Sequence, residues 1–145
     1  MAVCAKDFMT KEVITIEARE SVLDAAKLMT KRDVGGLVVV RNKTPVGMVT
    51  DRDIIVKAVA KGARLDKVKI GKIMSKPLVM VKPDTPMIKI AKLMERKSIR
   101  RVPVVEGKEV VGIVTMSDMG RACKILAPYL LPRAPEIYLT PKKHK

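Results

Sequence analysis

Gly47-Met48-Val49-Thr50 and Gly112-Ile113-Val114-Thr115 are nearly the same four residues, placed 65 positions apart in one chain. The match extends without a gap over residues 5–54 and 70–119. Most of the identical pairs are apolar and therefore mark packing positions, whereas the repeated Thr and Asp are polar. A duplication of this kind is the signature of a fold assembled from two similar units.

The length of 145 residues fits one compact domain. A repeat of about 60 residues would bury only a marginal core alone, so we expect the two copies to pack together. The predicted boundaries are 1–66 for the first repeat and 67–127 for the second. Residues 128–145 are rich in proline and end in Lys-Lys-His-Lys, which predicts an extended basic tail.

Several classes of function are disfavoured by what the sequence contains. No leader pattern is visible at the start, and the apolar runs are too short to span a bilayer, so we predict a cytoplasmic protein. Cys4 and Cys123 are the two cysteines and His144 is the single histidine. A zinc cluster or a histidine-dependent catalytic site therefore cannot be assembled, and a reactive thiol would lack a histidine to activate it. We predict no catalytic residues, no metal and no cofactor, and hence not an enzyme.

Each copy begins with a short β-forming run, continues with apolar residues at helical spacing and two further strands, and closes with a second helix. The prediction is a β-α-β-β-α unit occurring twice, in an α/β fold of the α+β type whose units pack pseudo-symmetrically as one module. In the first copy we predict the strand 13–16, a helix face of Val22, Ala25, Ala26 and Met29, the hairpin strands 37–41 and 46–50, and the helix 51–61, which ends near Gly62. In the second copy we predict the strand 78–81, an N-cap at Thr85 before Pro86, a helix face of Met87, Ile90, Ala91 and Met94, the hairpin strands 102–105 and 110–115, and the helix 117–126.

The repeated Thr-x-x-Asp element, Thr50 to Asp53 and Thr115 to Asp118, lies where a strand passes into a helix. A Thr three residues before an acid predicts a capping box. A capping box nevertheless prefers Glu or Gln to Asp, and free N–H groups at a helix N-terminus also suit a phosphate. An adjacent Asp can accept two hydrogen bonds from ribose hydroxyls. Helix capping and ligand binding both remain open.

The whole unit resembles the cystathionine-β-synthase (CBS) domain, which occurs in tandem pairs called Bateman modules. The resemblance covers about residues 5–125 and rests on the β-α-β-β-α order, on Met9-Thr10 and Met74-Ser75, and on Ile99 to Val105. It rests above all on Gly-h-h-Thr-x-x-Asp at the end of each copy, where h is apolar. The resemblance implies a non-catalytic regulatory module that binds AMP, ADP, ATP or S-adenosylmethionine in two clefts between the repeats.

The resemblance also implies roles for individual residues. Asp53 and Asp118 would hold the ribose hydroxyls, and Thr50 and Thr115 would meet the ribose or phosphate. The position before each Asp, Arg52 or Ser117, would contact phosphate. The adenine would lie against the residues that correspond to the family's first two strands, namely Val13, Ile14, Val34, Gly36, Leu78, Val79, Ile99 and Arg101. Arg100 stands where a basic side chain reaches the phosphates, although a solvated surface arginine is the alternative.

The two copies differ at positions that would line the clefts. Arg52 corresponds to Ser117, the pair Gly35-Gly36 corresponds to Arg100-Arg101, and Val38 corresponds to Pro103. We therefore expect two related but unequal sites, of which the first-copy pocket is roomier and locally less basic.

The formal net charge of +15 indicates an anionic ligand, a nucleic acid or an acidic partner, or else a surface adapted to heat. Seven basic side chains and one acid fall within residues 57–76. A basic nucleic-acid-binding protein is thus the alternative function. Against it, Phe8, Tyr129 and Tyr138 are the only aromatic residues, which leaves no stacking platform for single strands. The resemblance further implies a homodimer and a separate regulated protein.

Overall fold

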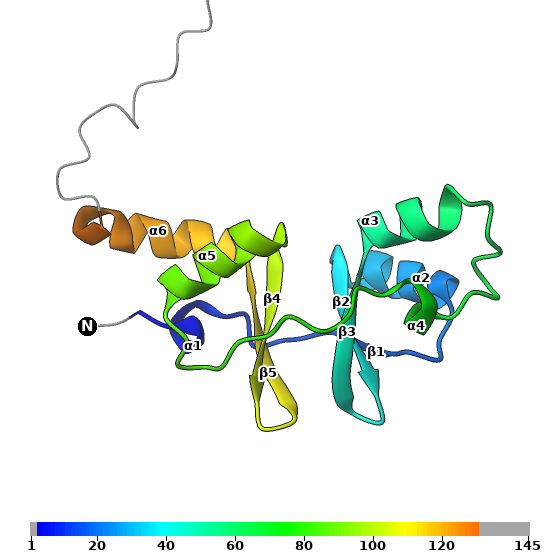
Figure 1. Ribbon diagram of the computed structural model, residues 1–145, viewed down its shortest axis with the longest axis horizontal. Helices are drawn as coiled ribbons and strands as arrows, with labels where there is room; N and C mark the ends of the chain where they lie inside the picture. The colour runs from blue at the N-terminus through cyan, green and yellow to red at the C-terminus, as the bar shows by residue number, and fades with distance from the viewer. Residues whose placement is uncertain (1–2, 131–145) are drawn as a thin grey trace, which may run out of the picture.

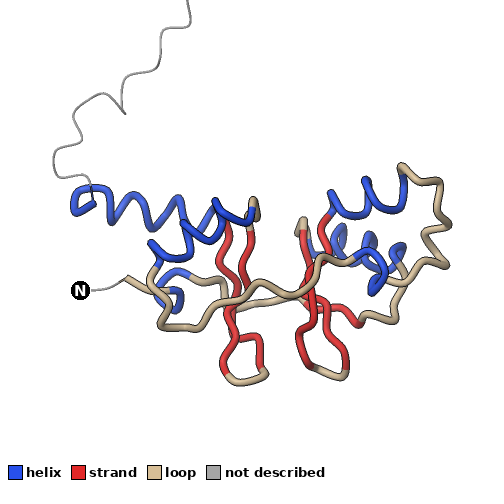
Figure 2. Tube along the Cα trace, in the orientation of Figure 1, coloured by secondary structure: helices blue, strands red, loops and turns tan. Residues whose placement is uncertain are grey.

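Two halves, each a small sheet with helices, lie side by side in the computed structural model, which describes residues 3–130 (Figure 1). The sheets meet in the middle and the helices cover the outer sides (Figure 2). The first half contains β1 (Thr15–Glu17), α2 (Val22–Arg32), β2 (Gly36–Arg41), β3 (Thr44–Thr50) and α3 (Asp51–Ile54), which continues as the π-helix η1 (Ile55–Val59). The second half contains α5 (Met87–Lys97), β4 (Arg101–Glu106), β5 (Glu109–Thr115) and α6 (Met116–Leu130). Two short helices, α1 (Ala5–Phe8) and α4 (Ile70–Ile73), complete the described elements. The predicted fold class of two tandem repeats is confirmed.

The predicted helix faces point into the two cores. Val22, Ala25 and Met29 of α2 are buried. Met87, Ile90 and Met94 of α5 are buried at the corresponding positions. Both helices end in a left-handed residue at the same place in the repeat, Asp33 in one copy and Ser98 in the other. Each helix therefore buries one face with a period of 3.6 residues, and the buried positions correspond between the two copies.

The start of α2 is a capping box. Ser21 Oγ accepts a hydrogen bond from Asp24 N, and the Asp24 carboxylate accepts one from Ser21 N. Hydrogen bonds from Ser21 to the Asp24 carboxylate, that of the hydroxyl first and that of the backbone N–H second, lower the pKa of Asp24 below its ordinary value. The stabilisation from the ionised carboxylate is thus present at neutral pH and is lost as the pH falls through that lowered pKa. The prediction for α5 was wrong: its N-cap is Pro86, and Thr85 Oγ1 instead accepts from Lys82 N in the preceding turn.

Replacing Ser21 with alanine is expected to lower the free energy of unfolding by about 1 kcal/mol, because the first turn of α2 loses its side-chain acceptor. Urea unfolding followed by circular dichroism measures the change. Thr85→Ala is the matched comparison and should have a smaller effect, since Thr85 does not cap a helix. An equal or larger loss for Thr85→Ala would contradict this assignment.

The first strand forms in one copy only. β1 pairs in parallel with β2, and Val38 N donates to Ile14 O at 3.2 Å. In the second copy the predicted strand 78–81 is reduced to an isolated bridge between Val81 and Val104, so that prediction was wrong. The residue corresponding to Val38 is Pro103, which has no N–H to donate. The single Val38/Pro103 difference therefore explains why the second sheet has two strands and the first has three.

The hairpins match their predictions within two residues at each end, and the second helix of the first copy runs from Asp51 to Val59, close to the predicted 51–61. Gly62 has a φ of +65°, as a residue that ends a helix does. The last helix differs, because α6 continues to Leu130 and passes Pro128, beyond the predicted end at residue 126. The rest of the predicted tail, residues 131–145, lies outside the described residues. The predicted repeat boundaries remain a prediction.

The two copies exchange their N-terminal segments. Residues 3–10 pack on the second half: Ala5 is fully buried in the core of α5, α6, β4 and β5, and Thr10 forms a bridge with Ile113 of β5. Residues 70–75 pack on the first half in the same way, with Ile70 fully buried and Ser75 bridged to Met48 of β3. We call residues 3–10 and 70–75 the exchanged segments. Each core is thus built from both sequence copies.

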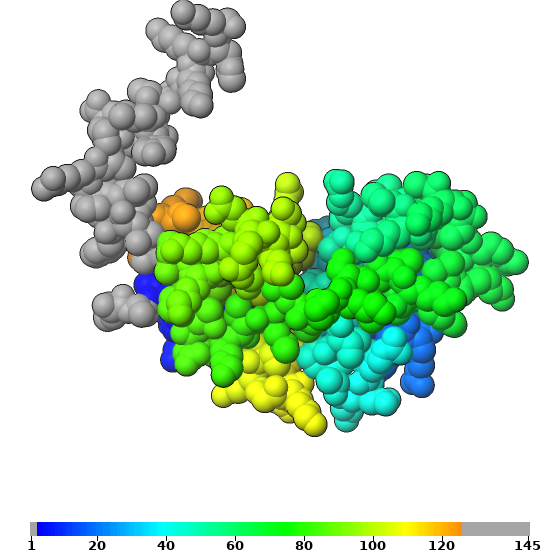
Figure 3. Space-filling model, viewed as in Figure 1, coloured from blue at the N-terminus to red at the C-terminus, as the bar shows by residue number. Residues whose placement is uncertain are grey.

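Glycines in β3 and β5 make room for the exchanged segments. A side chain at Gly47 would stand 2.7 Å from the carbonyl oxygen of Ser75, and one at Gly112 would stand within 3.1 Å of the side chain of Met9. The chain then crosses between the halves after each exchanged segment, and the later crossing runs over the front of the molecule in Figure 3. Among the described residues, none of the helices combines the length and the apolar character that crossing a membrane requires.

Candidate functional site

A cleft of about 410 Å³ opens between the two halves. Its walls come from the crossing before β1, from the entries into β2 and β4, and from the junction of β5 with α6. The lining residues are Thr10, Glu12, Val13, Ile14, Val34, Gly35, Gly36, Arg100, Arg101, Ile113, Thr115, Met116 and Ser117. The cleft therefore combines apolar side chains, two arginines and the start of a fifteen-residue helix.

Eight of the fifteen predicted site residues meet in this cleft, although they come from four separate parts of the sequence. They are Val13, Ile14, Val34, Gly36, Arg100, Arg101, Thr115 and Ser117. Seven predicted residues do not line it: Thr50, Arg52, Asp53, Leu78, Val79, Ile99 and Asp118. The first six of these correspond, at the offset of 65, to Thr115, Ser117, Asp118, Val13, Ile14 and Val34. Asp118 lies directly behind the cleft wall, as its contacts below show.

Backbone hydrogen bonds hold each strand-to-helix junction against the neighbouring strand entry. Met116 N donates to Arg100 O at 3.1 Å, and Asp51 N donates to Gly35 O at 3.0 Å in the first copy. The Thr-x-x-Asp elements are thus fixed beside the residues that differ most between the copies. Sequence comparison alone did not predict this proximity.

Arg101 lies across the glycine pair that it faces. A side chain at Gly36 would stand 3.0 Å from Cδ of Arg101, and one at Gly35 would stand 2.6 Å from its Nη2 atom. Asp51 Oδ2 lies 3.1 Å from the same added atom at Gly35. Gly35 and Gly36 therefore provide the space for the Arg101 side chain. The glycine pair of the first copy and the arginine pair of the second thus form different parts of the same cleft wall.

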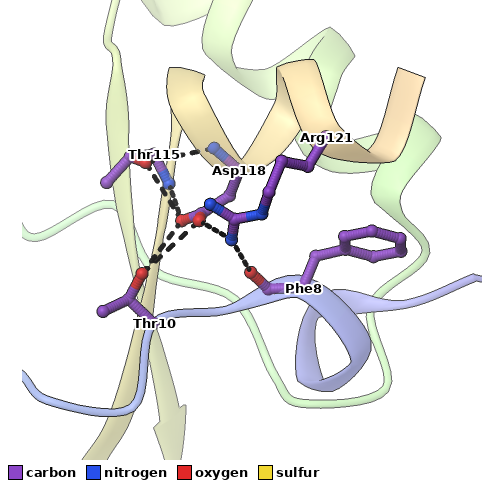
Figure 4. A network of polar contacts seen from close by, with 5 residues as sticks. All are labelled: Phe8, Thr10, Thr115, Asp118 and Arg121. Atoms are coloured by element: carbon purple, nitrogen blue, oxygen red, sulfur yellow. Dashed lines mark hydrogen bonds and ion pairs between the residues drawn. The ribbon is translucent and has the colours of Figure 1, made fainter. Parts of the chain in front are cut away.

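Asp118 is 1% exposed and accepts hydrogen bonds from several donors (Figure 4). Its Oδ2 accepts from Thr115 N at 2.8 Å and from Thr115 Oγ1 at 3.0 Å. Arg121 Nη2 forms an ion pair with its Oδ1, and Thr10 Oγ1 makes long contacts of 3.4 and 3.5 Å with the two oxygens. Asp118 N in turn donates to Thr115 Oγ1 at 3.3 Å. The capping box proposed from the sequence is present here.

Asp53 has a similar but more open environment. Its Oδ2 accepts from Thr50 N at 3.0 Å, and its own N–H donates to Thr50 Oγ1 at 3.1 Å. Lys57 Nζ lies 3.1 Å from its Oδ1, and Ser75 Oγ lies 3.5 Å from the same oxygen. The Asp53 side chain is 13% exposed. Both Asp residues therefore cap a helix. Their binding of a ligand stays a prediction.

Sequence reasoning missed Thr10, Glu12, Ile113 and Met116 in the cleft, and Lys57 and Arg121 beside the carboxylates. The pairing of Thr10 with Ser75 in the duplication was the available signal for the first of these. Lys57 and Arg121 gave no such signal, because they do not stand at matching positions of the two copies.

Neither the basic stretch nor a cluster of metal ligands indicates a second functional site in the described residues. Within the part of the chain that the structure describes, no group of three His, Cys, Asp or Glu is placed to hold a metal ion. The seven basic side chains between residues 57 and 76 are all exposed, and Lys57 and Arg64 form ion pairs with Asp53 and Asp66. The nucleic-acid hypothesis stays a prediction that salt-dependent mobility shifts can test.

Comparison with known proteins identifies the repeat. The sequence pattern of the CBS domain matches residues 5–59 and again residues 70–124. Protein MK0525 of Methanopyrus kandleri is 36% identical over 123 residues, which are 83% of this chain and 61% of that protein. The chain thus spans about three fifths of the length of that relative.

Two solved structures show the same arrangement. One is the CBS domain pair of protein MJ0100 in complex with 5′-methylthioadenosine and S-adenosyl-L-methionine. It superposes on this chain with a TM-score of 0.77 at 32% identity, and the alignment covers 86% of this chain and 98% of the MJ0100 chain. The hexameric CBS-CP12 protein from bloom-forming cyanobacteria superposes with a TM-score of 0.76 at 30% identity and covers 94% of this chain and 92% of that one.

Proposed function

The chain belongs to the CBS domain family, and from that premise we propose that it is a non-catalytic regulatory module whose inter-repeat cleft binds an adenosine compound. The observation that supports this most strongly is the cleft itself, which brings Thr115 and Ser117 of one copy together with Val13 and Ile14 of the other. MJ0100, a relative in structure, holds two adenosine compounds in its CBS domain pair.

The chemistry of the cleft suits each part of an adenosine nucleotide. Val13, Ile14 and Val34 offer apolar contact for the flat face of adenine. Arg100 is exposed at the cleft and supplies a cation for phosphate, and Ser117 in the first turn of α6 lines the same cleft. We propose AMP, ADP, ATP or S-adenosylmethionine as the ligand, with the pseudo-symmetric residues around Thr50, Arg52 and Asp53 as a second, unequal site.

Calorimetric titration with AMP, ADP, ATP and S-adenosylmethionine is the direct test. At least one of the four should bind, and its 2′,3′-dideoxy analogue should bind about 100-fold more weakly, because two hydrogen bonds from ribose to a carboxylate are lost. A folded protein that binds none of the four would refute the proposal. Equal affinity for the dideoxy analogue would leave the ligand class intact but remove Asp53 and Asp118 from the ribose.

A substitution at Gly36 tests which cleft is used. Gly36→Val is expected to weaken binding at least tenfold, since the added side chain enters space held by Arg101 in the cleft wall. Gly120→Val is the matched control, because nothing lies within 4 Å of a side chain at Gly120. Unchanged affinity in Gly36→Val, with the fold intact by circular dichroism, would place the ligand elsewhere.

The remaining parts of the proposal concern assembly and partners. We propose a homodimer that contacts through its helices, where Ile55, Val59 and Ile125 are exposed apolar side chains. Sedimentation velocity at micromolar concentration tests the assembly, and a hexamer like that of CBS-CP12 is the other named outcome. The regulated protein is a separate chain in this proposal, and the cytoplasmic location stays a prediction.

A further inference from the structure

Two basic side chains make the same pair of contacts on opposite sides of the module. Arg121 Nη2 forms an ion pair with Asp118 and also donates to Phe8 O at 3.3 Å. Lys57 Nζ pairs with Asp53 at 3.1 Å and also donates to Ile73 O at 3.1 Å. In each case a cation of the helix after the Thr-x-x-Asp element joins the Asp of that element to the backbone of an exchanged segment.

The acceptors occupy equivalent positions of the duplication, but the cations do not. Phe8 corresponds to Ile73 at the offset of 65, whereas Lys57 corresponds to Ala122 and Arg121 to Val56. Arg121 lies three residues after its Asp and Lys57 lies four after its own, in the stretch where the helix widens to π geometry. Two different positions thus produce one arrangement, which is the reason that aligning the copies does not reveal it.

A hydroxyl from each exchanged segment completes the arrangement. Thr10 Oγ1 makes long contacts with the Asp118 carboxylate, and Ser75 Oγ makes one with Asp53. Thr10 lines the cleft, whereas Asp118 is buried behind it. We call each set a carboxylate clasp: Asp118, Arg121, Thr10 and the Phe8 carbonyl form one, and Asp53, Lys57, Ser75 and the Ile73 carbonyl form the other.

The clasps leave little room for a further donor. An ionised carboxylate offers about four lone-pair positions. The Asp118 carboxylate already receives Thr115 N, Thr115 Oγ1, Arg121 and Thr10. A ribose diol that donates two hydrogen bonds to Asp118 must therefore displace donors. Thr115 N and Thr115 Oγ1 both belong to the helix cap, so the donors available for displacement are those tied to the exchanged segment.

We propose that Arg121 and Lys57 are positioning residues that couple ligand occupancy to the exchanged segments: an adenosine compound that takes an Asp carboxylate opens the clasp and loosens residues 3–10 or 70–75. This inference rests on the proposed function. It gives the proposed regulatory module a route to an output, because each exchanged segment connects one half of the module to the other.

Linkage fixes the sign of the effect of removing a clasp cation. If ligand and Arg121 compete for Asp118, Arg121→Met removes the competitor and tightens ligand binding, by about tenfold for a typical coupling. The same change frees Phe8 O and should speed amide exchange in residues 3–10 without ligand. A residue that only supported the cleft would instead weaken binding when removed. The conservative variant Arg121→Lys should fall between Arg121→Met and the native protein in both measurements.

Hydrogen–deuterium exchange of the full chain, free and with AMP or S-adenosylmethionine at concentrations saturating in calorimetry, tests the coupling. The expected result is faster exchange of residues 3–10 with ligand, and faster exchange of the same residues but not of 70–75 in Arg121→Met. Lys57→Met should show the converse pattern. Arg64→Met is the matched control, because its ion pair with Asp66 lies outside both clasps.

The outcomes separate the two proposals. If neither compound binds the native protein, the proposed function fails and the coupling fails with it. If a compound binds but leaves the exchange of both segments unchanged or slower, the coupling alone is overturned. Weaker ligand binding in Arg121→Met would overturn it as well, since that result assigns Arg121 a supporting role. Tighter binding together with faster exchange of residues 3–10 supports it.

Discussion

Replacing Ile70 with alanine is expected to destabilise the first half of the molecule, although residue 70 belongs to the second sequence copy. Ile70 is fully buried in the core that contains Val22, Leu37 and Val49. Truncation of a buried isoleucine leaves a cavity and costs about 2 to 5 kcal/mol. Urea unfolding measures the loss, and amide exchange locates it: protection should fall first in α2 and β2.

Met80→Ala is the control for this prediction, because Met80 is 51% exposed, lies outside the helices and should change stability little when truncated. The location of the effect is the decisive part. If Ile70→Ala reduced protection mainly in α5, β4 and β5, the exchanged segments would not pack as described. A uniform loss across both halves would mean instead that the two cores unfold as one cooperative unit.

The exchange illustrates what the duplication could predict and what it could not. Apolar spacing identified the faces of α2 and α5, because each face depends only on a local period of 3.6 residues. The same spacing does not indicate on which half residues 3–10 and 70–75 pack. That packing depends on contacts between segments far apart in the sequence, such as Thr10 with Ile113, and these are not a local property of the sequence.

The missing strand in the second copy shows a different limit. Residues 78–81 have the composition of a strand, and the local pattern predicts one. A strand also needs donors on its neighbour, and Pro103 lacks the N–H that Val38 supplies in the first copy. The difference between Val38 and Pro103 was visible in the sequence, but its consequence depends on a pairing that only the structure shows.

The candidate site was also predicted only in part. Eight of the residues that the family resemblance implied lie around one cleft, because strand entries and strand-to-helix junctions keep their positions in a repeated unit. The resemblance did not predict the contacts of Lys57 and Arg121 with the Asp carboxylates, since the two residues lie at positions that do not match between the copies. Of the two open interpretations of Thr-x-x-Asp, helix capping is observed in both copies, and ligand binding stays a prediction.

The second large effect is expected at Asp118. Asp118→Ala should lower the free energy of unfolding by about 2 to 4 kcal/mol, because it leaves the Thr115 N–H without its acceptor and opens space at a buried position. The ion pair itself contributes little to this figure, since the Arg121 side chain is 59% exposed. Most of the loss comes from the buried helix cap and from the contact with Thr10. Thermal and urea unfolding measure it.

Asp53→Ala provides the matched comparison within the same molecule and should cost about 1 kcal/mol, the usual value of a helix cap. Asp53 makes the same backbone contacts, but it is more exposed and solvent can replace some of its donors. Asp66→Ala, which removes an exposed ion pair, sets the baseline. If Asp53→Ala and Asp118→Ala were equally destabilising, burial would not be what separates the two carboxylates. If Asp118→Ala lowered the free energy of unfolding no more than Asp66→Ala, the contacts that tie residues 3–10 to α6 would not stabilise the fold. A ligand that displaced these contacts would then not change the stability of that packing.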